Sequence, residues 1–185
     1  MQASSGQMTT SPLPALVRGG ALAGEWVLDP GRSSVQLRSR SLGLVRVNGV
    51  FREVSGNGTV GPGGEVSGTV TVAAASIDTN NTRRDTHLRS ADFFDSGSHP
   101  DITFTADGIR PSGDGRGVAV TGALTVCGHT RPISFDAAAS VQGNGEVSLD
   151  AEVIVSRADF GLTWNRLGLV SMNNTLTVHT TFTRR

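Results

Sequence analysis

The chain has 185 residues, with sixteen basic and sixteen acidic side chains that give a formal net charge of zero. A chain with this charge offers no electrostatic surface for nucleic acid or for an anionic membrane, so we expect neither partner. The length suits one domain that is large enough to enclose a cavity, and 24 glycines with no tyrosine favour short strands and turns over helices.

The first 24 residues lack the basic start and the long apolar run of a signal peptide, and no later stretch is apolar enough to span a bilayer. We therefore expect a cytoplasmic protein with no stable membrane insertion. Residues 1–24 are predicted to be a flexible tail, or alternatively a lid over a cavity mouth that uses the apolar cluster between Leu13 and Val17. Residues 25–185 are predicted to form the folded domain, and its single cysteine, Cys127, excludes an internal disulfide.

Alternating apolar and polar residues predict strands through the first part of this domain. The turn Asp29-Pro30-Gly31 separates the first two strands, and the glycine-rich stretches 56–58 and 61–64 are interpreted as hairpin connections. The predicted strands in this part of the chain lie near residues 26–28, 35–37, 45–52 and 66–74.

The segment from Arg83 to Asp95 interrupts this alternation and is rich in charged side chains. Asn80 or Asn81 is a suitable N-cap, and the turn ends at Ser90, so the sequence predicts one short helix. Two adjacent phenylalanines follow the helix and form an aromatic corner that must be buried somewhere.

The second part of the domain again alternates, apart from one irregular insert at 156–164. Its predicted strands lie near residues 102–105, 118–126, 132–141, 147–155 and 176–182. Because no strand–helix–strand alternation appears, the chain is predicted to be all-β with about eight antiparallel strands. Closing such a sheet removes its edges, so an up-and-down barrel is the leading architecture and a sandwich is the alternative.

The predicted inward face contains many small residues, which bears on what the barrel holds. Gly49, Gly122, Ala137, Ala139 and Ala151 would fill little volume. Either the barrel is flattened or an apolar molecule occupies its interior.

Eight motifs occur in an order that resembles the YceI-like family, and the resemblance covers Trp26 to the C-terminus. No single motif is specific, but the ordered set is. The motifs are Trp26-Val27-Leu28-Asp29-Pro30 with Ser33-Ser34-Val35, Gly49-Val50-Phe51, Ser76-Ile77-Asp78-Thr79, Arg84-Asp85-Thr86-His87-Leu88, Asp92-Phe93-Phe94-Asp95, Pro100-Asp101-Ile102-Thr103-Phe104, Gly122-Ala123-Leu124-Thr125-Val126-Cys127-Gly128 and Ser156-Arg157-Ala158-Asp159-Phe160-Gly161.

The resemblance implies an extended eight-stranded antiparallel lipocalin-like β-barrel with one short helix and an irregular insert. It also implies an apolar tunnel for one long isoprenoid chain, such as a polyprenyl phosphate or a quinone tail, in a carrier or stress-related binding protein that is often a homodimer. The residues expected to line the tunnel are Leu42, Leu44, Val47, Phe51, Phe93, Phe94, Ile102, Phe104, Leu124, Phe160 and Trp164.

A departure from the family pattern suggests where the ligand head group lies. The family commonly has histidine where this chain has Arg32, and the resemblance places this position near the tunnel entrance. Arg32 would favour an anionic head group such as a phosphate. Arg84, Asp85 and His87 are further candidates for contact with the head group. The alternative, which we prefer, is that Arg84 and Asp85 brace the helix, with an ion pair from Asp85 to Arg89, while the phenylalanines plug the barrel.

We expect no catalytic residue, no metal and no cofactor other than a bound polyisoprenoid or quinone-like molecule. The four histidines, His87, His99, His129 and His179, show no ligand spacing. A second hypothesis is a cyclase or isomerase that folds a polyketide- or terpenoid-like substrate in the barrel and polarises it with Asp85, His87 or Arg32.

Overall fold

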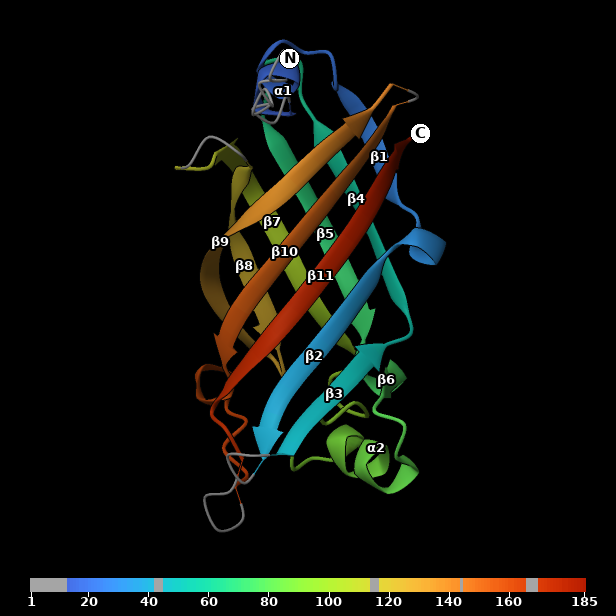
Figure 1. The fold of residues 1–185 in the computed structure, drawn as a ribbon, viewed down its shortest axis with the longest axis vertical. Coiled ribbons are helices and arrows are strands. Elements are labelled where there is room, and N and C mark those ends of the chain that lie inside the picture. The colour runs from blue at the N-terminus through green and yellow to red at the C-terminus, as the bar shows by residue number, and fades with distance from the viewer. Residues whose placement is uncertain (1–12, 42–44, 114–116, 144, 166–169) are drawn as a thin grey trace, which may run out of the picture.

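The computed structural model describes residues 13–41, 45–113, 117–143, 145–165 and 170–185, which form one continuous antiparallel sheet with short helices at its two ends (Figure 1). The α-helices are α1 (Leu13–Arg18) and α2 (Thr82–Arg89), and the 3-10 turns are η1 (Pro30–Arg32), η2 (Ala74–Ser76) and η3 (Arg157–Phe160). The strands are β1 (Gly24–Leu28), β2 (Ser34–Ser41), β3 (Val45–Phe51), β4 (Val54–Val60), β5 (Val66–Ala73), β6 (Ile77–Asp78), β7 (Asp101–Pro111), β8 (Val118–Val126), β9 (His129–Gln142), β10 (Glu146–Ser156) and β11 (Asn173–Arg184).

The sheet closes on itself through β11, which pairs with β10 along one edge and with both β1 and β2 along the other. The bend at η1 separates β1 from β2, and residues 52–53 separate β3 from β4, so each of these pairs continues one long strand. Counted in this way, the described strands form a closed eight-stranded antiparallel barrel, with β6 as a short addition to β3. The predicted all-β barrel is therefore confirmed.

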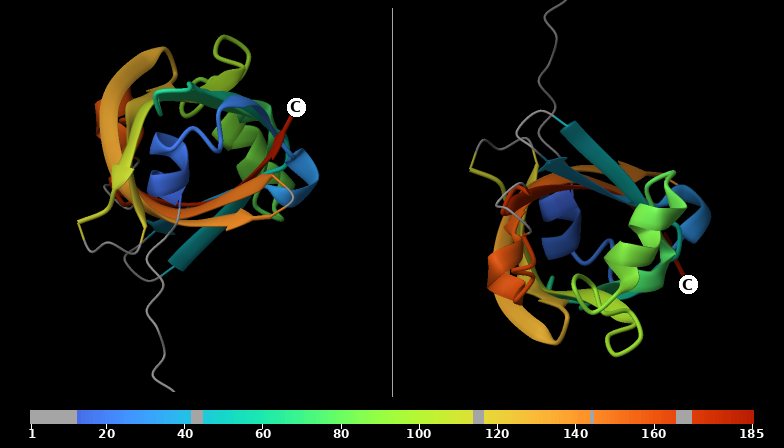
Figure 2. Two further views of the ribbon diagram at one scale, coloured as in Figure 1. Left: turned by 90° about the horizontal axis from the view of Figure 1, so that it is seen from above. Right: turned by 90° about the horizontal axis from the view of Figure 1, so that it is seen from below.

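The buried side chains fall into two clusters, one at each end of the barrel. The cluster at the α1 end includes Leu13, Val17 and Trp26, and the cluster at the α2 end includes Phe51 and Phe94. Seen along the barrel, α1 lies within the ring of strands at one end and α2 lies across the other end (Figure 2). No helix among the described residues is long and apolar enough to cross a membrane.

Helix α2 has the ends that its sequence predicts. The Asn81 side chain accepts a hydrogen bond from the backbone N–H of Arg84, and Ser90 is the C-cap. Two other predictions are wrong. The chain has a second short helix, α1, where the sequence suggested none, and the stretch 56–58 lies inside β4 and makes no hairpin turn.

Close approach of neighbouring atoms explains the glycine at position 56 of β4. A Cβ added to Gly56 would lie 2.7 Å from the backbone oxygen of Thr69 and 3.3 Å from Cδ1 of Leu28. Glycine in a strand often marks such an approach, and here it was misread as a turn signal.

Candidate functional site

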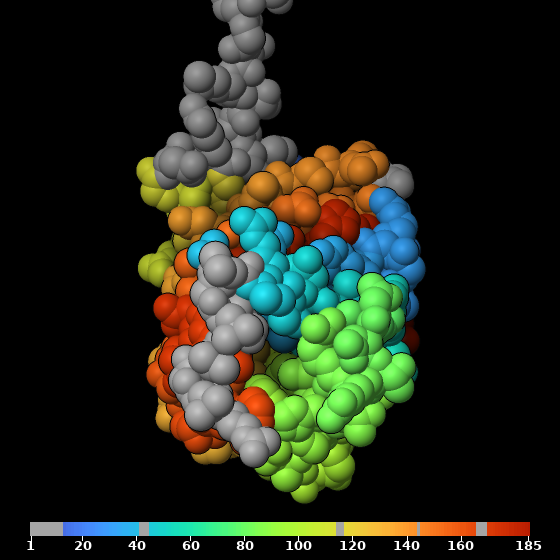
Figure 3. Space-filling model, turned by 60° about the horizontal axis from the view of Figure 1, so that its bottom comes forward, coloured from blue at the N-terminus to red at the C-terminus, as the bar shows by residue number. Residues whose placement is uncertain are grey.

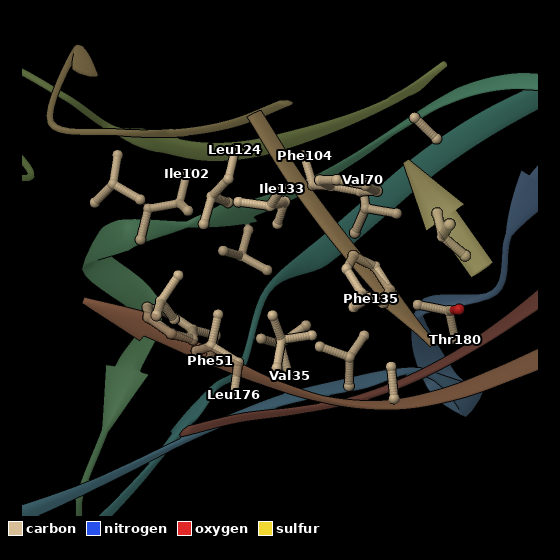
Figure 4. A pocket seen from close by; sticks show the side chains of 18 of the residues that line it. Val35, Phe51, Val70, Ile102, Phe104, Leu124, Ile133, Phe135, Leu176 and Thr180 are labelled. Carbon is tan, nitrogen blue, oxygen red and sulfur yellow. The ribbon is translucent and has the colours of Figure 1, made fainter. Parts of the chain in front are cut away.

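The barrel encloses a cavity of about 450 Å³, and residues from both ends of the barrel line it. Strands around the whole ring contribute alternate residues, because every second side chain of a strand points inward. Figure 4 shows apolar side chains such as Val70, Phe135 and Leu176 facing one another across this space, with the hydroxyl of Thr180 as a polar atom among them. The cavity is therefore shaped for a long apolar molecule.

Most of the residues expected to line the tunnel do line the cavity. Leu42 and Leu44 lie outside the described residues. The predicted residues in the lining are Val47, Phe51, Phe93, Phe94, Ile102, Phe104, Leu124, Phe160 and Trp164.

The small inward residues contribute unequally to this space. Gly49, Ala137 and Ala151 line the cavity. Gly122 is absent from the described lining. Neither glycine leaves space for a side chain, since a Cβ at Gly122 would lie 2.8 Å from the ring of Phe104 and a Cβ at Gly49 would lie 2.8 Å from Cδ1 of Ile77.

Helix α1 closes one end of the cavity with buried apolar side chains. Leu13, Val17 and Leu22 all line the cavity and are almost fully buried. The indole N–H of Trp26 donates to the backbone oxygen of Leu22 at 2.9 Å, and the Arg184 guanidinium lies 5.2 Å from the centre of the Trp26 indole. These contacts fix the segment between α1 and β1 across the opening.

At the other end, aromatic rings gather beside α2. His87 packs edge-on against both Phe93 and Trp164, at centroid distances of 5.1 and 4.6 Å, and these two rings are 5.1 Å apart. Phe94 packs edge-on against Phe51 at 5.7 Å. The molecular surface at this end is hollowed next to α2 (Figure 3). The aromatic corner predicted from the sequence is therefore part of this mouth.

Arg84 and Asp85 brace α2 through one threonine. The carboxylate of Asp85 accepts hydrogen bonds from the backbone N–H and the hydroxyl of Thr79, at 3.0 and 2.5 Å. Arg84 donates to the Thr79 hydroxyl and backbone oxygen at 2.8 and 2.9 Å. The geometry agrees with the bracing interpretation. The ion pair expected between Asp85 and Arg89 is not formed, and Arg89 instead donates to the backbone oxygen of Ile77. Of the charged residues on α2, Arg84 lines the cavity and Asp85 does not.

Arg32 lies on the outside of the barrel. Its guanidinium donates two hydrogen bonds to the Glu146 carboxylate, at 2.5 and 2.6 Å, and it is absent from the described cavity lining. Val147 lines the cavity, so the neighbouring Glu146 faces outward. The hydrogen bonds from Arg32 lower the pKa of Glu146. The structure thus places Arg32 apart from the other head-group candidates.

Arg157 belongs to the lining but was not among the residues expected there. It begins η3, directly after β10, and is 3% exposed. Its Nη2 donates to the backbone oxygen of Trp164 at 2.8 Å, its guanidinium lies 6.0 Å from the centre of the Phe93 ring, and burial lowers its pKa. The sequence signal that could have identified Arg157 is the motif that begins at Ser156. That motif was used only as part of the family resemblance.

Charge in the described lining is carried by Arg84 and Arg157, together with the titratable His87, and no carboxylate contributes to it. Elsewhere in the described chain, no three His, Cys, Asp or Glu side chains are grouped so that they could hold a metal ion. The cavity therefore combines a long apolar interior with positive charge at the α2 end.

Comparisons with known proteins agree on one family. A family model described as a YceI-like domain matches residues 26–182. Protein YceI of Escherichia coli O6:H1 is 31% identical over 153 residues, which cover 78% of this chain and 79% of that protein. A UPF0312 protein of Pectobacterium carotovorum is 34% identical over 155 residues, with the same coverage of 78% and 79%.

Solved structures have the same fold. BcnA of Burkholderia cenocepacia has a TM-score of 0.75 at 23% identity, covering 83% of this chain and 98% of its own. A polyisoprenoid binding domain from Saccharophagus degradans has a TM-score of 0.70 at 16% identity, covering 86% and 98%. The YCEI protein of Campylobacter jejuni has a TM-score of 0.59 at 27% identity, covering 74% and 85%.

Proposed function

The chain belongs to the YceI-like domain family, and from this premise we propose that it binds one long isoprenoid-type lipid inside its barrel. The ligand would be a polyprenyl phosphate or a quinone-like molecule, and the role would be carriage, storage or a response to stress. The Saccharophagus degradans domain, described as binding polyisoprenoid, supports this choice of ligand class through its shared fold.

The observation that carries the proposal is the apolar cavity with lining residues at both ends of the barrel. It reaches from Leu13 and Val17 of α1 to Leu88 of α2. A prenyl chain placed there would remove on the order of several hundred Å² of apolar surface from water, at roughly 25 cal/mol per Å². Tight binding therefore needs only a matching apolar shape and no chemical step.

The alternative of a cyclase or isomerase has less support from the geometry. It relied on Asp85, His87 or Arg32 to polarise a substrate, and of these three only His87 lines the cavity. His87 itself lies at the mouth, where Asp92 is 3.0 Å from its Nε2. An enzyme of this kind would need its polarising group deep in the cavity, beside the folded substrate.

Native mass spectrometry of freshly purified protein, followed by organic extraction, tests the proposal. We expect one additional mass per chain that matches a prenyl lipid, and an affinity that rises with chain length for added prenols. Affinity that does not depend on chain length would contradict binding in the cavity. The same spectra report whether the protein is the expected homodimer.

A further inference from the structure

The α2 end of the cavity contains a buried cation whose hydrogen bonds are incomplete. Of the nitrogen atoms of Arg157, Nη2 donates to Trp164, whereas Nε and Nη1 are buried and have no hydrogen-bond partner among the described residues. Buried polar groups are normally satisfied, and an unpaired buried donor costs free energy. The unpaired donors therefore require an acceptor that the described protein residues do not supply.

The Arg157 side chain belongs to the cavity lining beside α2. The side chain lines the cavity and lies over Phe93, which contacts His87 of α2. Arg84 is one turn before His87 on the same helix and also lines the cavity. A chain that fills the barrel and ends at this mouth would bring its terminal group to both arginines.

A second buried polar atom lies on the neighbouring strand. Asn174 of β11 pairs with Val155 of β10, two residues before Arg157, and it also lines the cavity. Its Oδ1 atom is buried, and no hydrogen-bond partner for it lies in the described part of the chain. A turn of this amide about its last torsion would present the NH₂ group to an acceptor bound by Arg157.

The charge balance separates two kinds of head group. A quinone carbonyl would satisfy hydrogen-bond donors, but it would leave the buried positive charge without a counter-charge. No carboxylate is present in the described lining to supply one. An isolated buried charge is unfavourable, whereas the planar guanidinium binds a phosphate or carboxylate through paired hydrogen bonds.

We propose that Arg157, assisted by Arg84 and Asn174, binds an oxyanion head group, a phosphate or a carboxylate, on a long apolar chain. This inference rests on the proposed function, since it places the head group of the same ligand. It favours an acidic prenyl lipid over a quinone. It also assigns the head group to the α2 end and not to the position of Arg32.

Binding by the wild-type protein tests the inference without a variant. Affinities are measured for geranylgeranyl phosphate, geranylgeranoic acid, geranylgeraniol and a quinone with a prenyl tail of the same length. We expect the phosphate, the carboxylate or both to bind about tenfold or more tightly than the alcohol and the quinone, as charge-assisted hydrogen bonds should confer. The stronger of the two acids identifies the oxyanion.

Substitution of Arg157 then identifies the residue responsible. Arg157→Met should lower affinity for the preferred acid to that of the alcohol and leave alcohol binding unchanged, and Arg157→Lys should restore part of the preference. Arg131→Met, which removes the same charge from an exposed site on β9, is the control and should keep the preference. The melting temperature of ligand-free Arg157→Met should not fall, because the substitution removes an unpaired buried charge.

The outcomes separate the inference from the function on which it rests. If geranylgeraniol binds but neither acid is preferred, or if Arg157→Met keeps the preference, the head-group assignment is overturned and the apolar cavity stands. If none of the four probes binds the wild-type protein, the proposed function fails as well.

Discussion

At the scale of single residues, the pair formed by Arg32 and Glu146 holds the bend between two strands against the barrel wall. Arg32 ends η1, which separates β1 from β2, and Glu146 begins β10. The Glu146 carboxylate is nearly buried, at 5% side-chain exposure, and accepts both hydrogen bonds from the guanidinium. The pair therefore ties η1 to the outer face of a strand more than a hundred residues away in sequence.

This pair should make stability depend on pH in a defined direction. Its hydrogen bonds lower the pKa of Glu146 in the folded state, so its contribution is complete above the ordinary glutamate pKa of 4.5 and is lost as pH falls through the lowered value. We expect Glu146→Gln to be less stable than wild type at neutral pH, with the difference shrinking in acid. Urea unfolding of both proteins, from neutral pH down into acid, measures this difference in the free energy of unfolding.

Glu152→Gln is the matched control, because Glu152 is an exposed glutamate on the same outer face of β10. It should leave the free energy of unfolding nearly unchanged at every pH. A difference between wild type and Glu146→Gln that is constant with pH would contradict a role for the charged pair.

At the scale of the element, β4 contains two glycines that should respond oppositely to the same substitution. A Cβ at Gly56 would lie 2.7 Å from the oxygen of Thr69, whereas a Cβ at Gly58 would be in ordinary contact, 3.4 Å from the oxygen of Ser67. We expect Gly56→Ala to lower the free energy of unfolding by about 1–3 kcal/mol through overpacking. Gly58→Ala should be neutral or stabilise by about 0.5–1 kcal/mol. Chemical denaturation compares the two, and equal effects would contradict close packing at Gly56.

Helix α1 is six residues long, too short to be stable alone, so its burial in the barrel mouth must hold it. Leu13 and Val17 face the cavity, and Ala15 is exposed. We propose that the helix is a lid. The double substitution Leu13→Asp and Val17→Asp should then speed the release of bound geranylgeraniol by about tenfold or more, because two apolar contacts are lost.

A dilution experiment with labelled prenol measures this release, and Ala15→Asp is the control that adds a carboxylate to the exposed face. The barrel of the double variant should keep its circular dichroism spectrum. Release as slow as in wild type would show that α1 does not limit exit from the cavity.

These elements also show which parts of the structure the sequence could predict. Long alternating stretches and the caps of α2 are local signals, and they correctly predicted the barrel, α2 and the strands other than β4 and the short β6. Gly56 of β4 was misread as a turn residue because its requirement for glycine comes from the close approach of β5 and Leu28, which lie elsewhere in the sequence. The burial of Arg157 likewise depends on contact between η3 and residues near α2, such as Phe93, which only the folded chain brings together.

At the scale of the whole molecule, the length of the barrel should set the length of the chain it can hold. The cavity lining joins the cluster beside α1 to the cluster beside α2. Between the two mouths, Ala151 of β10 lies opposite Ala137 of β9 and Val178 of β11 in the sheet, and all three line the cavity. This wall of small side chains keeps the passage open.

Filling this wall should shorten the usable cavity without closing it. In Ala151→Phe we expect the affinity for a long polyprenol to fall by about tenfold or more, because part of the chain loses its buried surface. Farnesol, which is short enough for one half of the cavity, should bind almost as in wild type.

Ala138→Phe adds the same ring to the exposed face of β9 and should change neither affinity. Titration of both prenols into the three proteins measures the effect. If Ala151→Phe weakens the binding of farnesol and of the long polyprenol equally, the prenyl chain does not extend along the barrel, and the cavity does not select ligands by their length.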